Sequence, residues 1–106
     1  MDSTGQPIVL ELVGRITPAD VSLLCARLRR RATVDRAGRE VVCDAARLTV
    51  ADLTAVEAVA RLRLTARRLG RELRLANAGP ELLTLLALVG LGDDGPGLPA
   101  PVSPRR

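Results

Sequence analysis

The chain has 106 residues and a net charge of +4, and 47% of its residues are hydrophobic, which predicts one domain with its own core. It contains no His and no aromatic residue, so it offers neither a histidine base nor a stacking platform for single-stranded nucleic acid. Its two cysteines match no metal-ligand spacing. These features argue against an enzyme, a bound metal or cofactor, and a nucleic-acid-binding protein.

The sequence contains no apolar run long enough to span a membrane, and its first residues resemble no export signal. We therefore expect a cytoplasmic protein without a membrane contact. In that reducing compartment Cys25 and Cys43, each inside an apolar run, are expected to be buried free thiols.

In the first half of the chain, residues 7–14 are almost continuously apolar, which is typical of a strand covered on both faces. Thr17 followed by Pro18 predicts an N-cap and a first helical residue, and the apolar spacing continues the helix to about residue 32. Residues 35–39 predict a turn, and residues 40–44 predict a short strand that ends at Asp44.

In the second half, residues 51–69 predict a long amphipathic helix, and Gly70 is placed to end it. Residues 71–76 predict a third strand nearer an edge, and residues 81–89 a last helix. We expect residues 1–6 to be disordered, residues 7–94 to form the domain, and residues 95–106 to be a flexible tail rich in Pro, Gly and Arg.

The alternation of strands and helices predicts an α/β fold with a mainly parallel central sheet of three to four strands flanked by helices. Binding sites in such folds gather at the carboxyl ends of the strands. Two of these ends are residues 14–17, with Arg15 and Thr17, and residues 44–54.

The order and spacing of these segments resemble the STAS domain, which is named from sulphate transporters and bacterial anti-sigma factor antagonists. The resemblance covers residues 7 to about 94 and rests on Val9–Gly14, Asp44, residues 48–52, Gly70 and the leucine-rich segment 81–91. In the antagonists, Asp-Ser-Ser/Thr-Gly stands before the long helix, and the first Ser is phosphorylated by an anti-sigma factor that is also a kinase. The resemblance implies that the unmodified form binds this kinase and thereby frees a sigma factor.

This chain departs from that motif at the phospho-acceptor. Asp52 matches the Asp, Leu53 replaces the first Ser, Thr54 takes the second hydroxyl position, and Ala55 replaces the Gly. Phosphorylation at position 53 is therefore impossible. Thr54 is a candidate acceptor, although its side chain points about 100° further round the helix.

Each of these residues also has a structural interpretation. Asp52 is either a partner contact or an acid that stabilises the helix N-terminus. Thr49 and Asp52 form the pattern Thr-x-x-Asp, which is close to the capping-box motif. Leu53 either contacts a partner or continues the buried stripe with Val56, and the periodicity favours the core. Asp44 either binds a partner or hydrogen-bonds the loop that follows it.

The Arg residues favour a solvated surface over a basic groove. Arg27, Arg30 and Arg31 form the densest group, whereas on the long helix Glu57 is spaced to pair with Arg61.

Two functional hypotheses follow. The first is a non-catalytic regulatory module that resembles an anti-sigma factor antagonist. It would bind an anti-sigma factor or a related histidine-kinase-like regulator through Arg15, Thr17, Asp44, Asp52, Leu53 and Thr54, without the Ser switch. The second is a STAS-like sensor or scaffold that binds a small apolar ligand or forms a homodimer, unrelated to sigma factors.

Overall fold

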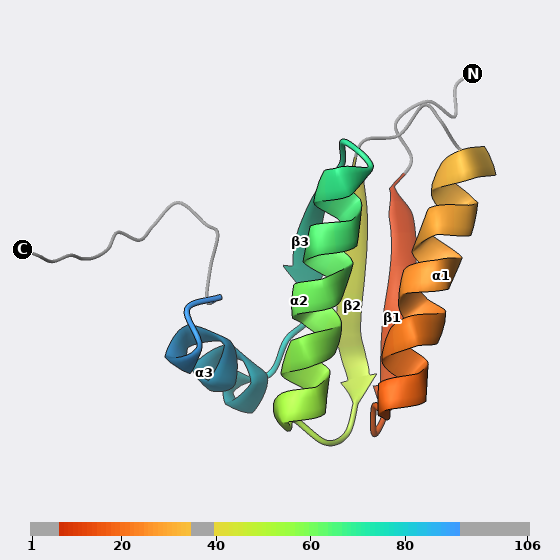
Figure 1. Cartoon of the computed structure of the whole chain (residues 1–106). Coiled ribbons are helices and arrows are strands. Elements are labelled where there is room, and N and C mark those ends of the chain that lie inside the picture. Colours follow the sequence, from red (N-terminus) through yellow and green to blue (C-terminus); the bar gives the residue numbers. More distant parts are fainter. Residues whose placement is uncertain (1–6, 35–39, 92–106) are drawn as a thin grey trace, which may run out of the picture.

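The computed structural model describes residues 7–34 and 40–91 (Figure 1). Strands and helices alternate and the strands are parallel, as the sequence predicts, and the order of the three strands in the sheet is β1-β2-β3. The elements are β1 (Ile8–Gly14), α1 (Pro18–Val34), β2 (Glu40–Leu48), α2 (Leu53–Arg68), β3 (Glu72–Ala76) and α3 (Pro80–Leu88).

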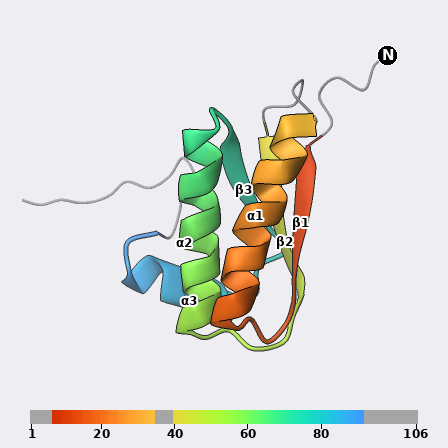
Figure 2. The same cartoon turned by 45° about the vertical axis from the view of Figure 1, so that its right-hand side comes forward.

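Helices cover one face of the sheet. Figures 1 and 2 show α1 and α2 side by side in front of the strands, with α3 set against the lower end of α2. Burial alternates along β1, where Ile8, Leu10 and Leu12 are buried and the residues between them are exposed. The expectation that this strand is covered on both faces is therefore wrong. Right-handed crossovers between strands taken in sequential order place α1 and α2 on the same face.

The core between the sheet and the two helices consists of aliphatic side chains and two thiols, and the polar residues Thr65 and Arg71 are buried at its margin. Leu28 of α1 and Leu62 of α2 are fully buried within it. Cys25 and Cys43 are buried free cysteines, as predicted, and burial raises the pKa of the Cys43 thiol to about 12. A thiol that stays protonated at neutral pH is a poor nucleophile, so Cys43 serves packing.

The first helix begins as local sequence chemistry predicts. The backbone N–H and the hydroxyl of Thr17 both donate to Asp20 Oδ2 at 2.9 Å, and the N–H of Asp20 donates back to Thr17 Oγ1 at 3.2 Å. This reciprocal pair is a capping box, with Asp20 in place of the usual Glu or Gln. Gly70 follows α2 with a φ of +75°, a conformation that glycine adopts without steric cost.

Other boundaries differ from expectation. Strand β2 continues past Asp44 to Leu48, and α2 begins at Leu53, two residues later than predicted. The predictions for residues 1–6, 35–39 and 95–106 lie outside the described residues. Among those described, no helix is long and apolar enough to cross a membrane.

The buried stripe of α2 generates a stability prediction. Replacement of Leu62 by Ala removes fully buried methyl groups and leaves a cavity, so the free energy of unfolding should fall by about 2–5 kcal/mol. Leu64 lies on the same helix with 47% of its surface exposed, and Leu64→Ala should change stability by about 0.5 kcal/mol or less. Urea denaturation of both variants measures the difference, and equal losses would contradict the assigned core.

Candidate docking site

The N-terminus of α2 is held by Asp52. The Asp52 Oδ1 atom accepts a hydrogen bond from the backbone N–H of Ala55 at 3.0 Å, so Asp52 is the N-cap. Thr49 does not cap this helix. Its backbone N–H instead donates to the carbonyl of Gly14 at 3.0 Å and joins the loop after β1 to the loop after β2. The two strand ends that the sequence singled out are therefore adjacent.

Leu53 lies at the first position of α2, and 67% of its surface is exposed. The expectation that it continues the buried stripe with Val56 is wrong. Residues three apart on a helix diverge by about 60°, and the buried face of α2 centres on Ala58 and Leu62, away from Leu53. A large apolar side chain thus stands in solvent at the mouth of the longest βα loop.

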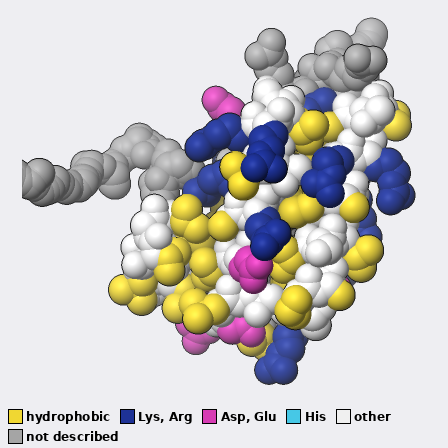
Figure 3. Space-filling model, in the orientation of Figure 1, with side chains coloured by type: hydrophobic (Ala, Val, Ile, Leu, Met, Phe, Trp, Pro, Cys, Tyr) yellow, Lys and Arg dark blue, Asp and Glu magenta, His cyan; other side chains and the backbone are white. Residues whose placement is uncertain are grey.

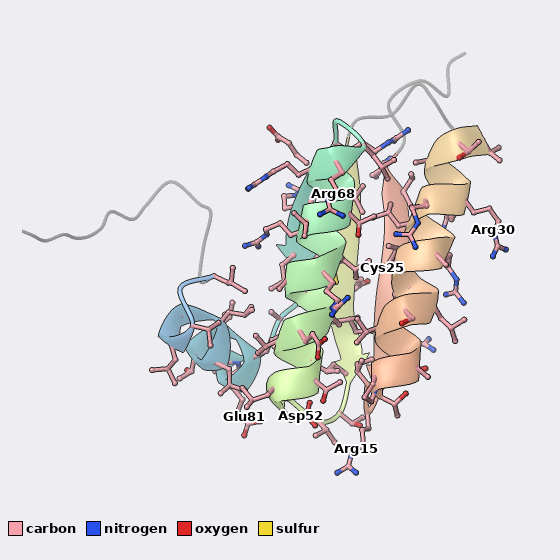
Figure 4. The ribbon with its side chains drawn as sticks, in the orientation of Figure 1. Arg15, Cys25, Arg30, Asp52, Arg68 and Glu81 are labelled. Atoms are coloured by element: carbon pink, nitrogen blue, oxygen red, sulfur yellow. The ribbon has the colours of Figure 1, made fainter. Side chains whose placement is uncertain are left out.

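The remaining predicted residues at this end differ in how far they are exposed. Thr54 is half-buried beside Leu53, and Thr17 is exposed but bonded to Asp20 in the capping box. Arg15 is exposed, and Figure 4 shows Arg15, Asp52 and Glu81 at the same end of the molecule. We call Arg15, Asp52, Leu53, Thr54 and Glu81 the α2 N-terminal surface.

Asp44 lies elsewhere. It does not end β2 but pairs with Glu11 and Ala76 inside the sheet, and its side chain points to the face opposite the helices because Cys43 and Ala45 point inward. Its Oδ1 atom accepts hydrogen bonds from the Ala46 backbone N–H and from Asn77 Nδ2, both at 3.0 Å. The structure thus separates Asp44 from the α2 N-terminal surface.

The Asn77 contact was missed by sequence reasoning. Asn77 has a φ of +58°, a left-handed conformation that Asn tolerates better than most residues. Its bond, followed by that from Ala46, holds the pKa of the Asp44 carboxyl below its usual range. The contact spans 33 residues of sequence, so no local pattern signals it.

Helix α3 contributes a second set of apolar side chains that the sequence analysis did not single out. Leu82 and Leu86 are buried, whereas Leu83, Leu88 and Val89 are exposed. Figure 3 shows hydrophobic side chains gathered over α3 and the N-terminal end of α2. The sequence did contain a signal for exposed leucines, because the segment has more leucines than one buried face of a helix requires.

The basic side chains of the helices form no unbroken groove. Glu57 Oε2 accepts a hydrogen bond from Arg61 Nε at 3.0 Å, as the i,i+4 spacing predicts, and both side chains are largely exposed. Figure 3 shows acidic as well as basic side chains on the helical face. Within residues 7–34 and 40–91, no group of three or more Cys, Asp or Glu side chains could hold a metal ion.

Leu53 and Leu83 are exposed on α2 and α3, and Arg15, Asp52 and Glu81 lie at the same end of the molecule, so this end combines apolar and charged groups suited to contact with another macromolecule. The fold is thus an α/β domain with an interaction surface at the carboxyl ends of its strands.

The chain belongs to the STAS domain family, because the family model described as "Mlab, STAS domain" matches residues 1–100. STAS domains are in general non-catalytic regulatory modules. A search of curated proteins gave no match to this chain.

The Asp44–Asn77 contact generates a pH prediction. Asn77→Gly keeps the left-handed backbone accessible and removes the donor, so the pKa of Asp44 should rise towards its usual value, as measured by carboxyl carbon NMR. Since the folded pKa of Asp44 is lowered, the bond stabilises above the unfolded pKa, and this contribution is lost as pH falls through the folded pKa.

The stability difference between the wild type and Asn77→Gly should therefore become smaller in acid, down to the part that the entropy of glycine in the unfolded chain contributes at every pH. Asn77→Ala is the matched comparison, because it loses the same donor but also strains the backbone, so it should be the less stable of the two variants. An unchanged Asp44 titration in both variants would contradict the assigned cause.

Proposed function

We propose that this STAS domain is a regulatory module that binds an anti-sigma factor or a related kinase-like regulator through the α2 N-terminal surface. The observation that carries the proposal is the exposure of Leu53, the residue that the resemblance to the antagonists puts at the position of their phospho-acceptor Ser. On this proposal the protein acts in the cytoplasm of a bacterium in the control of transcription.

The side chains at this site support binding of a partner that is not turned on or off by phosphorylation. In the antagonists, a phosphate at this helix N-terminus would interact well with the helix dipole and block docking by its charge and bulk. Leu53 has no hydroxyl to accept that phosphate, yet it occupies the same exposed place. An apolar side chain there adds contact area to an interface and leaves docking constitutive.

Charged groups around Leu53 can define orientation. Arg15 and Glu81 are exposed and lie on either side of Asp52 in Figure 4, whereas the Asp52 carboxylate is already bonded to the first turn of α2. Charges at the rim of an interface mainly affect the rate of encounter and the choice of partner. We therefore assign affinity to Leu53 and neighbouring apolar groups, and orientation to Arg15 and Glu81.

A second candidate function is a STAS-like scaffold that self-associates or binds a small apolar ligand. The observation that favours it is a shallow groove of about 190 Å³ beside β1, which is separate from Leu53.

A binding experiment tests the first proposal. Titration of the wild type with histidine-kinase-like anti-sigma factors of the same organism should detect a complex, and Leu53→Asp should weaken it about tenfold or more, roughly 1.4 kcal/mol, because a charge replaces an apolar contact. Leu64→Asp changes an exposed leucine further along the same helix and should leave affinity unchanged. Absence of binding to every such regulator, with or without ATP, would overturn the proposal.

The missing switch can be restored. Leu53→Ser rebuilds the Asp-Ser pair, so the bound kinase-like regulator and ATP should add one phosphate to this variant and none to the wild type, as read by intact mass. Thr54→Val controls for the neighbouring hydroxyl. Phosphate on the wild type that Thr54→Val abolishes would assign a switch to Thr54 and contradict constitutive docking.

A further inference from the structure

Strand β1 is an edge strand of the sheet that the described residues form, and its outward-pointing backbone groups can be identified. Arg31 of α1 donates from Nη1 to the carbonyl of Val9 at 3.0 Å, so this carbonyl points away from β2. The register to β2 shifts between Glu11 and Val13, where β2 has one extra residue, but beyond the shift the Gly14 carbonyl still points towards β2 and accepts from the Thr49 N–H. Because N–H and C=O groups alternate between the two sides of a strand, the outward groups of β1 belong to Val9, Glu11 and Val13. Such groups are a template for pairing with another strand.

Apolar side chains accompany these backbone groups. Val9 and Val13 are exposed on the face opposite the helices, with 54% of Val13 accessible, and Leu23 of α1 is 60% accessible on the flank that overhangs the edge. The groove of about 190 Å³ runs between this flank and β1. Its lining residues are Glu11, Val13, Ile16, Asp20, Leu23, Leu24 and Arg27.

We propose that β1 pairs antiparallel with β1 of a second copy of the chain, so that one continuous sheet runs through a two-fold dimer. The two-fold axis passes beside Glu11, and Val9 of each copy lies opposite Val13 of the other. This inference does not rest on the proposed regulator, because it concerns a different edge of the molecule.

The register follows from symmetry. Val9 and Val13 are equally spaced on either side of Glu11, so centring the axis there places all three outward-pointing residues of each strand in hydrogen-bonded pairs. It also matches valine with valine across the strands, and apolar cross-strand pairs of this kind stabilise a sheet. A two-fold interface requires this kind of self-complementarity.

Charge on α1 fits the same arrangement. The flank of α1 beside β1 has Asp20 near its N-terminal end and Arg27 and Arg31 towards its C-terminal end. Across the two-fold axis the two α1 helices run antiparallel, so the acidic end of each faces the basic end of the other. A stable interface typically buries about 1,200–2,000 Å², more than a short strand pair provides, so this flank has to take part.

One interaction opposes the dimer. The two Glu11 carboxylates face each other at the axis, and like charges directly opposite destabilise a strand pair. Arg27 lines the same groove as Glu11 but belongs to α1 on the helical side of the sheet, so the backbone and valine contacts of the strand pair have to outweigh this repulsion. Arg31 can retain its contact with the Val9 carbonyl, because a carbonyl oxygen has two lone pairs.

Sedimentation velocity of the full chain over a range of concentrations tests the proposal. The wild type should form a dimer that dissociates on dilution. Val13→Lys should raise the dissociation constant about tenfold or more. Glu11→Pro should do the same, because it removes an outward N–H while leaving the bonds to β2 intact. Glu11→Gln should tighten the dimer by removing the repulsion at the axis.

Leu88→Lys is the matched control, since Leu88 is 76% accessible on α3 and far from this edge, and it should leave the dimer unchanged. Circular dichroism establishes that each variant is folded, and Val13→Lys alone decides the matter if Glu11→Pro fails to fold. A wild type that stays monomeric at millimolar concentration, an assembly larger than a dimer, or a dimer insensitive to Val13→Lys would overturn the proposal. Weaker association of Glu11→Gln would overturn the register.

Discussion

The order of the three parallel strands is the constraint on which the rest of the structure depends. With β1, β2 and β3 adjacent in sequence order, each right-handed crossover returns on the same side, so α1 and α2 share one face. Within residues 7–34 and 40–91 the opposite face has no helical layer, and the alternation of buried and exposed residues in β1 follows from that. Because the helices lie on one face only, the side chain of Asp44 points away from the α2 N-terminal surface. For the same reason Val13 is exposed.

The features that the sequence predicted correctly are those that interactions between neighbouring residues determine. The start of α1 at Thr17 and Pro18 and the end of α2 before Gly70 depend on caps and backbone freedom that neighbouring residues determine. The alternation of elements was equally readable, because the hydrophobic period changes between strand and helix. Membership of the STAS family followed from the order of these elements.

The errors arose where contacts between distant segments decide the outcome. Strand β2 reaches Leu48 because its last residues pair with Val13 and Gly14, although an Ala-Ala-Arg run has little strand preference of its own. The exposure of Leu53 depends on which face of α2 packs on the sheet and α1, and that face centres on Ala58 and Leu62, about 140–180° round the helix from Leu53. Asn77 reaches Asp44 across two strands, which no single segment encodes.

The two proposed surfaces are compatible within one assembly. The β1 edge runs along the strand, whereas the α2 N-terminal surface lies at the carboxyl end of the sheet. In an antiparallel pairing of β1 with a second copy, the carboxyl ends of the two sheets point in opposite directions, so two docking surfaces face away from each other. Such a dimer presents two sites that a regulator can occupy without steric conflict, and a dimeric regulator cannot bridge them from one side. Dimerisation would therefore change how many regulators one assembly binds without changing the contacts that Leu53 makes with each.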